Sequence, residues 1–122
     1  MKKHGKTILV VDDHEMSLKL LFQILAGAGF DVFTASSGEA ALKLVQDFKP
    51  DLIVLDIILE GLNGYKTCQV LKIMAPSIPV VFLSTVPDRE KGLQLGAVDY
   101  ITKPFQMKEV VEVVKYHLGI TA

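Results

Sequence analysis

The sequence predicts a doubly wound α/β domain, with a five-stranded parallel sheet and helices on both of its faces. Short apolar runs, typical of buried strands, alternate with stretches whose apolar residues recur every three or four positions, as on one face of a helix. The alternation repeats five times, and right-handed crossovers distribute the helices over both faces. The 122 residues suit a single domain, and we expect no linker, repeat or second domain within them.

Individual elements follow from the apolar patterns and from residues that begin or end helices. Strands are expected over residues 7–11, 31–35, 52–55, 80–83 and 99–102. Helices are expected over residues 14–28, 38–48, 65–74 and 106–118, and a short fourth helix lies between residues 87 and 96. Ser37 can cap the second helix. Phe48 and Met107 belong to apolar stripes that we expect to face the sheet.

Polar residues stand at the ends of four expected strands. They are Asp12 and Asp13 after the first strand, Asp56 after the third, Ser84 after the fourth and Lys103 after the fifth. Ligands of open α/β sheets bind at the carboxyl ends of the strands. We therefore expect three carboxylates, one hydroxyl and one ammonium in one crevice, a set that suits a divalent cation and a phosphoryl group.

Converging carboxylates need compensation, because two like charges ~4 Å apart repel by ~4 kcal/mol at an effective dielectric near 20. Mg²⁺ supplies it, since this ion takes oxygen ligands and often pairs carboxylates with phosphate. The alternative is that Asp12 and Asp13 only cap the first helix, because Asp is favoured at helix N-termini.

Asp56 can serve as a metal ligand, as the nucleophile of aspartyl-phosphate chemistry, or as both. Lys103 fits as a point charge on a phosphoryl oxygen, and Ser84 can donate a hydrogen bond to the same group. The alternatives are a surface lysine before the turn at Pro104 and a plain hydroxyl at a strand end.

Several motifs carry a family resemblance and occur in order over nearly the whole chain. They are VVDD at residues 10–13, LD at 55–56, NG at 63–64, PVVFLS at 79–84 and GAVDYITKPF at 96–105. Together they resemble the receiver domain of bacterial two-component response regulators. The resemblance implies a flavodoxin-like (βα)5 fold with the strand order 2-1-3-4-5.

The resemblance also implies roles in a phosphorelay. Asp56 would accept a phosphoryl group from a sensor histidine kinase or a phosphotransfer protein. Asp13 and Asp56 would bind Mg²⁺ directly, together with the backbone carbonyl of Ile58. Asp12 would act mostly through a bound water.

A conformational switch is implied by the same resemblance. Lys103 would hold a phosphoryl oxygen, and the Lys103–Pro104 peptide bond would be cis. Ser84 would move toward the phosphoryl group, and Tyr100 would turn inward into the vacated space. The fourth helix, fifth strand and fifth helix would then present a changed face to a downstream effector or to a second copy of the chain.

Other features bound the function. The resemblance implies that the positions of Ile58 and Val86 tune dephosphorylation, and neither apolar side chain can orient an attacking water. We therefore expect slow self-dephosphorylation at most and no other enzyme activity. The net charge of -1 is not that of a nucleic-acid-binding protein, which needs a positively charged surface. No apolar run reaches the ~18 residues that a transmembrane helix needs. With one cysteine, Cys68, and no signal-peptide core after Met1, we expect a cytoplasmic protein.

Three departures from the family pattern bear on function. Glu60 stands where the family has proline, four residues after the acceptor, and Thr85 stands where alanine or glycine follows Ser84. Between Ser84 and Lys103 the chain is about three residues shorter than the family pattern. We therefore expect a shortened or displaced fourth helix and an altered partner surface.

Other functions stay open at this point. Glu60 and Thr85 are compatible with an interaction module that no longer uses phosphorylation. An aspartyl-phosphate phosphatase is disfavoured, because Ile58 stands where such enzymes need a second Asp as general acid. A flavin-binding electron carrier shares the fold, but two acids replace the phosphate-cradling loop after the first strand.

The side chain after Ser84 gives a first prediction. We expect Thr85→Ala to raise the rate at which a small-molecule phosphodonor modifies Asp56, because Thr85 narrows access to the acceptor. Mass spectrometry of the intact protein over time measures this rate. An unchanged rate would show that Thr85 is no obstacle.

Overall fold

The computed structural model describes residues 5–120 and contains five strands and five helices in strict alternation. The strands are β1 Thr7–Val11, β2 Asp31–Ala35, β3 Leu52–Leu55, β4 Val80–Ser84 and β5 Asp99–Thr102. The helices are α1 Glu15–Gly27, α2 Gly38–Phe48, α3 Gly64–Met74, α4 Arg89–Gln94 and α5 Met107–His117. The predicted elements are therefore confirmed, with small shifts at their ends.

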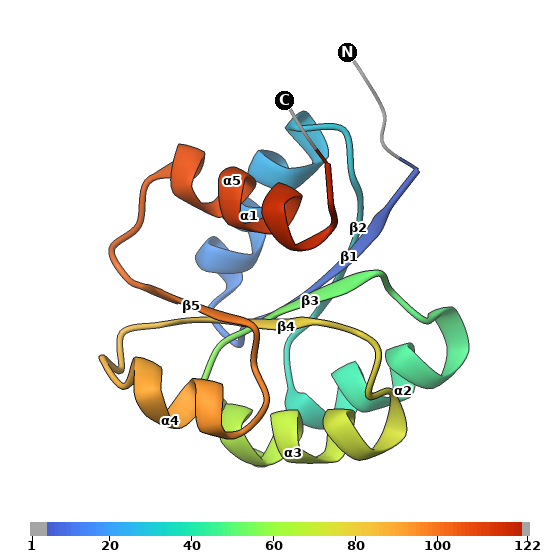
Figure 1. Cartoon of the computed structure of the whole chain (residues 1–122), viewed down its shortest axis with the longest axis vertical. Coiled ribbons are helices and arrows are strands. Elements are labelled where there is room, and N and C mark those ends of the chain that lie inside the picture. The colour runs from blue at the N-terminus through green and yellow to red at the C-terminus, as the bar shows by residue number, and fades with distance from the viewer. Residues whose placement is uncertain (1–4, 121–122) are drawn as a thin grey trace.

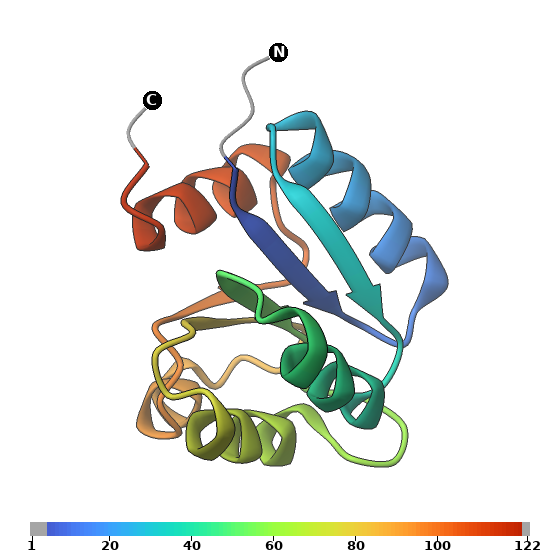
Figure 2. The same cartoon turned by 90° about the vertical axis from the view of Figure 1, so that its right-hand side faces the viewer.

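All strand pairs are parallel, and the sheet has the order β2-β1-β3-β4-β5. Figure 1 shows α1 and α5 on one face of the sheet and α2, α3 and α4 on the other. Figure 2 shows β1 and β2 side by side, with α1 and α2 on opposite sides of them. The expected doubly wound fold and its strand order are confirmed.

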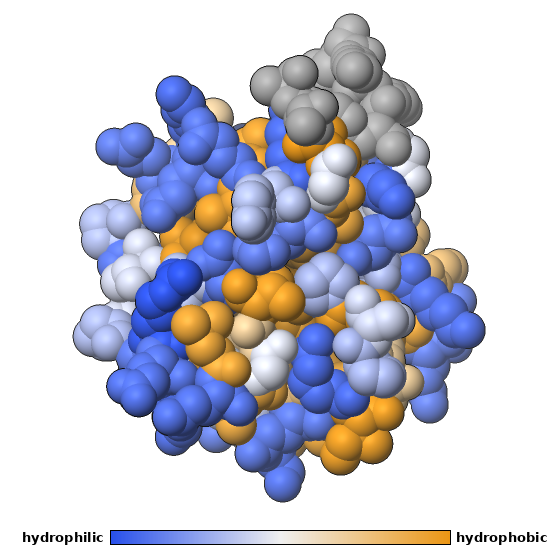
Figure 3. Space-filling model, in the orientation of Figure 1, coloured by the Kyte–Doolittle hydropathy of each residue, from blue (hydrophilic) through white to orange (hydrophobic). Residues whose placement is uncertain are grey.

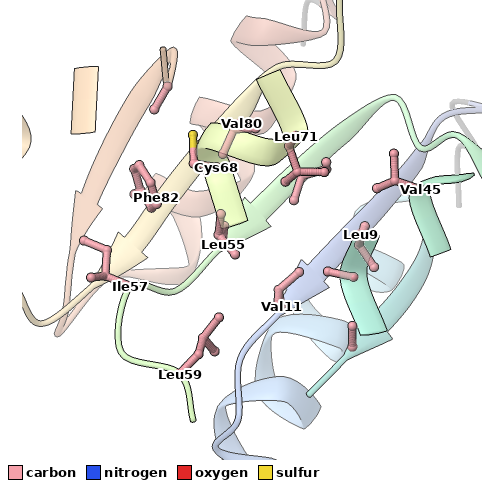
Figure 4. Close-up of a cluster of buried hydrophobic side chains, with 14 of the residues drawn as sticks. Leu9, Val11, Val45, Leu55, Ile57, Leu59, Cys68, Leu71, Val80 and Phe82 are labelled. Atoms are coloured by element: carbon pink, nitrogen blue, oxygen red, sulfur yellow. The ribbon is translucent and has the colours of Figure 1, made fainter. Parts of the chain in front are cut away.

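The core consists of two apolar layers, one on each face of the sheet, because successive strand residues point to opposite faces. Leu9 and Val11 of β1 belong to the layer beneath α2 and α3, whereas Ile8 and Val10 belong to the layer beneath α1 and α5. Figure 4 shows the first layer, where Leu71 of α3 and Val45 of α2 lie over the strands. Burying an aliphatic side chain of this size contributes about 1.5–3 kcal/mol, so the layers dominate stability.

Two inward predictions for helix residues were wrong. Phe48, the last residue of α2, is 57% exposed, and Met107, the first residue of α5, is 60% exposed. Each residue stands at a helix end, whereas the buried apolar side chains of α2 and α5 lie further inside these helices. Phe48 packs instead edge-to-face against Phe33 of the edge strand β2, with ring centroids 5.2 Å apart. The capping prediction is confirmed, because Ser37 accepts a hydrogen bond from the Ala40 N–H at 3.1 Å.

The fourth helix is short, as expected, because α4 has 6 residues where the other helices have 11 or 13. Asp88 caps its start by accepting the Lys91 N–H at 3.2 Å. A Cβ on Gly92 would lie 2.8 Å from the Tyr100 ring and 3.0 Å from the Phe82 ring. The missing side chain therefore lets the short helix sit directly on these two aromatic residues.

Hydrophilic side chains cover most of the face seen in Figure 3, and apolar surface is exposed in smaller areas between them. None of the helices in residues 5–120 has the length and apolar character needed to cross a membrane.

The loop after β3 doubles back tightly onto the strand end. The Gly64 N–H donates to the Ile57 carbonyl at 2.8 Å. A Cβ at Gly64 would overlap the Asp56 carbonyl oxygen and lie 2.5 Å from the Ile57 Cα. Only glycine fits here, because backbone atoms cannot move aside without displacing the loop.

This close approach predicts that Gly64→Ala lowers the free energy of unfolding by about 2–3 kcal/mol, a typical effect of overpacking. Gly27→Ala is the matched control, because no atom lies within 4 Å of a Cβ at Gly27. Urea unfolding of both variants measures the difference. Equal stability of the two variants would contradict the tight packing at Gly64.

Candidate functional site

The backbone hydrogen bonds of the sheet continue one residue past several strand ends. These extra bonds position the polar residues of the candidate site. The Asp56 N–H donates to the Val11 carbonyl at 2.9 Å, which brings Asp56 beside Asp12, the residue after Val11. The Lys103 N–H donates to the Ser84 carbonyl at 2.9 Å. Backbone bonds thus bring residues that are far apart in sequence to one edge of the sheet.

The Lys103 side chain bridges two carboxylates at this edge. Its Nζ lies 2.9 Å from Asp12 Oδ2 and 3.3 Å from Asp56 Oδ2. Both acids are buried, with Asp12 1% and Asp56 7% exposed. Because a buried charge is costly unless it is paired, one ammonium compensates two carboxylates that would otherwise repel each other.

Backbone donors hold the other oxygens of these carboxylates. Asp56 Oδ1 accepts the Ile57 N–H at 2.7 Å and the Ile58 N–H at 3.4 Å. Asp12 Oδ1 accepts the His14 N–H at 2.9 Å. The orientation of both side chains is therefore set by the loops that follow β1 and β3.

The pKa of Lys103 is raised above its ordinary value. Burial by itself lowers this pKa, but the hydrogen bond to Asp12 and the attraction of the Asp56 and Asp12 charges outweigh it. The ammonium form is therefore favoured in the folded protein at neutral pH.

Asp13 is more exposed than Asp12 and joins the loops after β1 and β3, because its Oδ2 accepts the Glu60 N–H at 3.2 Å. Possible metal-ligand atoms of Asp12, Asp13 and His14 all lie within 4.8 Å of one another. Asp56 does not belong to this group, and it is linked to Asp12 by Lys103, which contacts both carboxylates. Carboxylate oxygens of this kind suit a hard divalent cation.

The alternative in which Asp12 and Asp13 only cap α1 finds little support. The N-cap residue of α1 is His14, and no side-chain capping bond is present there in the described chain. The Asp12 carboxylate contacts Lys103 and the residue before the helix rather than the first turn. The pair therefore belongs to the edge of the sheet.

Ser84 and Tyr100 meet at one residue of the loop between β4 and α4. Ser84, fully buried at the end of β4, accepts the Val86 N–H on its hydroxyl oxygen at 3.4 Å. The buried Tyr100 hydroxyl donates to the Val86 carbonyl and accepts the Asp88 N–H at 3.5 Å. Tyr100 thus faces inward without a phosphoryl group, whereas the resemblance implied an inward turn on phosphorylation. The Ser84 hydroxyl contacts the loop rather than a carboxylate.

Sequence reasoning missed the backbone role of Val86, which it considered only for its apolar side chain. A backbone bond leaves no trace in residue type, and the short spacing between Ser84 and Lys103 was the one available signal. It also missed His14, whose position beside Asp13 could have drawn attention. The cis Lys103–Pro104 peptide bond implied by the resemblance is confirmed.

The parallel α/β fold and the carboxylate–ammonium cluster at its carboxyl edge together define a signalling domain of the receiver class. A family model described as the response regulator receiver domain matches residues 8–115. The chain belongs to this family, whose members act in two-component phosphorelay signalling.

Similar proteins agree with this assignment. PhoP of Bacillus subtilis (strain 168), the alkaline phosphatase synthesis transcriptional regulatory protein, is 47% identical over 109 residues, 87% of this chain and 45% of that protein. The DNA-binding response regulator MtrA of Mycobacterium tuberculosis (strain H37Rv) is 41% identical over 114 residues, 91% of this chain and 50% of MtrA. The chain therefore spans about half the length of these relatives.

A solved structure of a response regulator from Chloroflexus aurantiacus gives a TM-score of 0.89 at 34% identity. The match covers 95% of this chain and 99% of that one. The fold is thus shared over nearly the full length.

The ion pairs of Lys103 generate a prediction. Lys103→Met leaves Asp12 and Asp56 buried without a cation, so we expect the free energy of unfolding to fall by about 3 kcal/mol at pH 7. Because the folded-state pKa of Lys103 is raised, its contribution is complete below the unfolded value near 10.5 and is lost as pH rises through the folded value.

The free energies of unfolding of the wild type and of Lys103→Met should therefore differ by a constant amount from pH 7 to 9. The difference should shrink at higher pH. Urea unfolding across this range measures the difference, and Lys108→Met, which removes an exposed ion pair with Glu112, is the control. A difference in free energy of unfolding that stays unchanged at high pH would show that the ion pairs of Lys103 do not cause it.

Proposed function

We propose that Asp56 is the phosphoacceptor of this receiver domain and takes its phosphoryl group from the phosphohistidine of a sensor histidine kinase or a phosphotransfer protein. The observation that carries the proposal is the buried Asp56 carboxylate with the Lys103 ammonium 3.3 Å away. A carboxylate nucleophile needs an adjacent cation, because the incoming phosphoryl group is itself negative.

The transfer balances simply. One Asp56 carboxylate oxygen forms a bond to phosphorus while the phosphorus–nitrogen bond of phosphohistidine breaks, and the bonding electrons leave with the imidazole, which takes up a proton. Backbone donors to Asp56 Oδ1 keep the carboxylate fixed during the attack. Lys103 stabilises charge on the phosphoryl oxygens.

The carboxylates would hold Mg²⁺ at this edge, with Asp13, Asp56 and the backbone carbonyl of Ile58 as ligands and Asp12 acting through water. The three carboxylates suit a hard cation, because they offer oxygen atoms and carry more negative charge than Lys103, which contacts Asp12 and Asp56, neutralises by itself. When bound, the ion supplies charge neutralisation between the acceptor and the phosphoryl oxygens.

The switch in this proposal runs from Ser84 to Tyr100. Ser84 would leave the Val86 N–H to bond the phosphoryl group, and the loop that holds the Tyr100 hydroxyl would shift. The change would reach the face formed by α4, β5 and α5, where a downstream effector or a second copy of the chain would bind. We propose that residues 1–122 act as one receiver unit in the cytoplasm.

Self-dephosphorylation is expected to be slow, and we propose no other catalytic activity. Ile58 is exposed beside the site and Val86 lies in the β4–α4 loop, so neither apolar side chain can orient water. Glu60 and Thr85, the two residues compatible with a phosphorylation-independent module, both lie at the surface.

The test is phosphorylation of the full chain by acetyl phosphate in the presence of Mg²⁺, followed by intact-protein mass spectrometry. We expect the wild type to gain one phosphoryl group, Asp56→Asn to gain none and a chelator to block the reaction. Asp51→Asn, at the other end of β3, is the matched control, because Asn can still accept the Thr7 N–H that Asp51 binds at 2.7 Å.

Failure of the wild type to react with acetyl phosphate and to change its spectrum with beryllofluoride would contradict the proposal. That result would favour an interaction module that works without phosphorylation. Modification of Asp56→Asn at the wild-type rate would place the acceptor elsewhere.

A further inference from the structure

One buried polar atom in the described chain lacks a partner. The Tyr65 hydroxyl on α3 is inaccessible to solvent and makes no hydrogen bond, and it is the only such side-chain atom within residues 5–120. Native proteins leave few buried polar groups unpaired, and each exception calls for an explanation. The hydroxyl has no part in the phosphoryl site described above.

The Tyr65 ring lies between the elements that flank the short β4–α4 loop. It packs edge-on against Phe82 of β4, with ring centroids 5.7 Å apart, and Phe82 in turn lies 6.0 Å from the Tyr100 ring. The Lys91 ammonium of α4 lies 4.5 Å from the centroid of the Tyr65 ring. Movement of the loop or of α4 would therefore change the contacts of the Tyr65 ring.

The Tyr65 and Tyr100 rings pack against the same residue, Phe82. The pKa of Tyr65 is raised mainly by burial, and Tyr100 and Asp88 add to the rise through their charges. Tyr100 already bonds the Val86 carbonyl, and Asp88 follows in the same loop. The unpaired hydroxyl thus lies within electrostatic reach of the loop and of the residue that the loop holds.

Val86 connects this region to the phosphoryl site. Its N–H donates to the Ser84 hydroxyl, and its carbonyl accepts from the Tyr100 hydroxyl and from the Asp88 N–H at 3.0 Å. Departure of the Ser84 hydroxyl therefore removes the bond that holds the Val86 N–H. The loop is short, and a displaced Val86 carries its neighbours along. Backbone groups of the loop and the Tyr100 hydroxyl can then present new hydrogen-bond partners to Tyr65.

We propose that Tyr65 is a further positioning residue of the switch. Its hydroxyl is unpaired in the unphosphorylated domain and gains a hydrogen bond from the β4–α4 loop or from Tyr100 when the phosphoryl group draws Ser84 away. The unpaired group disfavours the first conformation, and the new bond stabilises the second. This inference rests on the proposed phosphorylation of Asp56.

The test compares Tyr65→Phe, which removes only the hydroxyl, with Tyr116→Phe, whose ring is 78% exposed on α5. Calorimetry gives the affinity of each full chain for beryllofluoride with Mg²⁺, and thermal unfolding gives the midpoint with and without these ligands. We expect Tyr65→Phe to bind beryllofluoride about tenfold more weakly, the factor that one net hydrogen bond provides. Its midpoint without ligand should be equal to or higher than that of the wild type.

The beryllofluoride affinity falls while the stability of the free protein does not, and a merely structural role would not produce this combination. Equal destabilisation of the free and bound states of Tyr65→Phe, or unchanged beryllofluoride affinity, would overturn the inference while the wild type still responds. A wild type that does not respond would instead overturn the proposed function. Fluorine NMR of 3-fluorotyrosine protein adds a direct readout, because the Tyr65 resonance should shift with beryllofluoride.

Discussion

The contact between the Lys103 ammonium and the Asp12 and Asp56 carboxylates is the interaction on which the rest of the site depends. It joins residues 91 and 47 positions apart, and it makes two buried like charges tolerable at one edge of the sheet. The ammonium also lies where an oxygen on a phosphorylated Asp56 would need a partner. Phosphoryl transfer would therefore replace one anion beside Lys103 by another, without exposing an unpaired charge.

The short segment between β4 and β5 connects this edge to the face where a partner would bind. Val86 holds the Tyr100 hydroxyl, and Arg89 at the start of α4 donates to the Tyr100 carbonyl at 3.1 Å and to Asp99 at 3.0 Å. The other Asp99 oxygen lies 2.9 Å from His117 at the end of α5. Loop, helix, strand and final helix are thus linked by polar contacts, and a shift of the loop has a physical route to this face.

Most of the fold could be predicted from the sequence. Buried strands such as residues 52–55 appear as apolar runs, and helices appear as apolar residues that recur every three or four positions. The convergence of Asp12, Asp56 and Lys103 could also be predicted, since polar residues at the ends of parallel strands must meet. The outward position of Phe48 could not, because periodicity does not show that the last residue of a helix lies outside the core. The backbone role of Val86 was equally hidden, since a peptide group is the same for every residue type.

The central claim is that Lys103 and Asp56 interact directly across the sheet edge, and a double-mutant cycle measures this most directly. The free energies of unfolding of the wild type, Lys103→Met, Asp56→Asn and the double variant give a coupling energy. The structure predicts a favourable coupling of at least about 1 kcal/mol at neutral pH, as for side chains in contact. Strictly additive effects of the two substitutions would contradict the account.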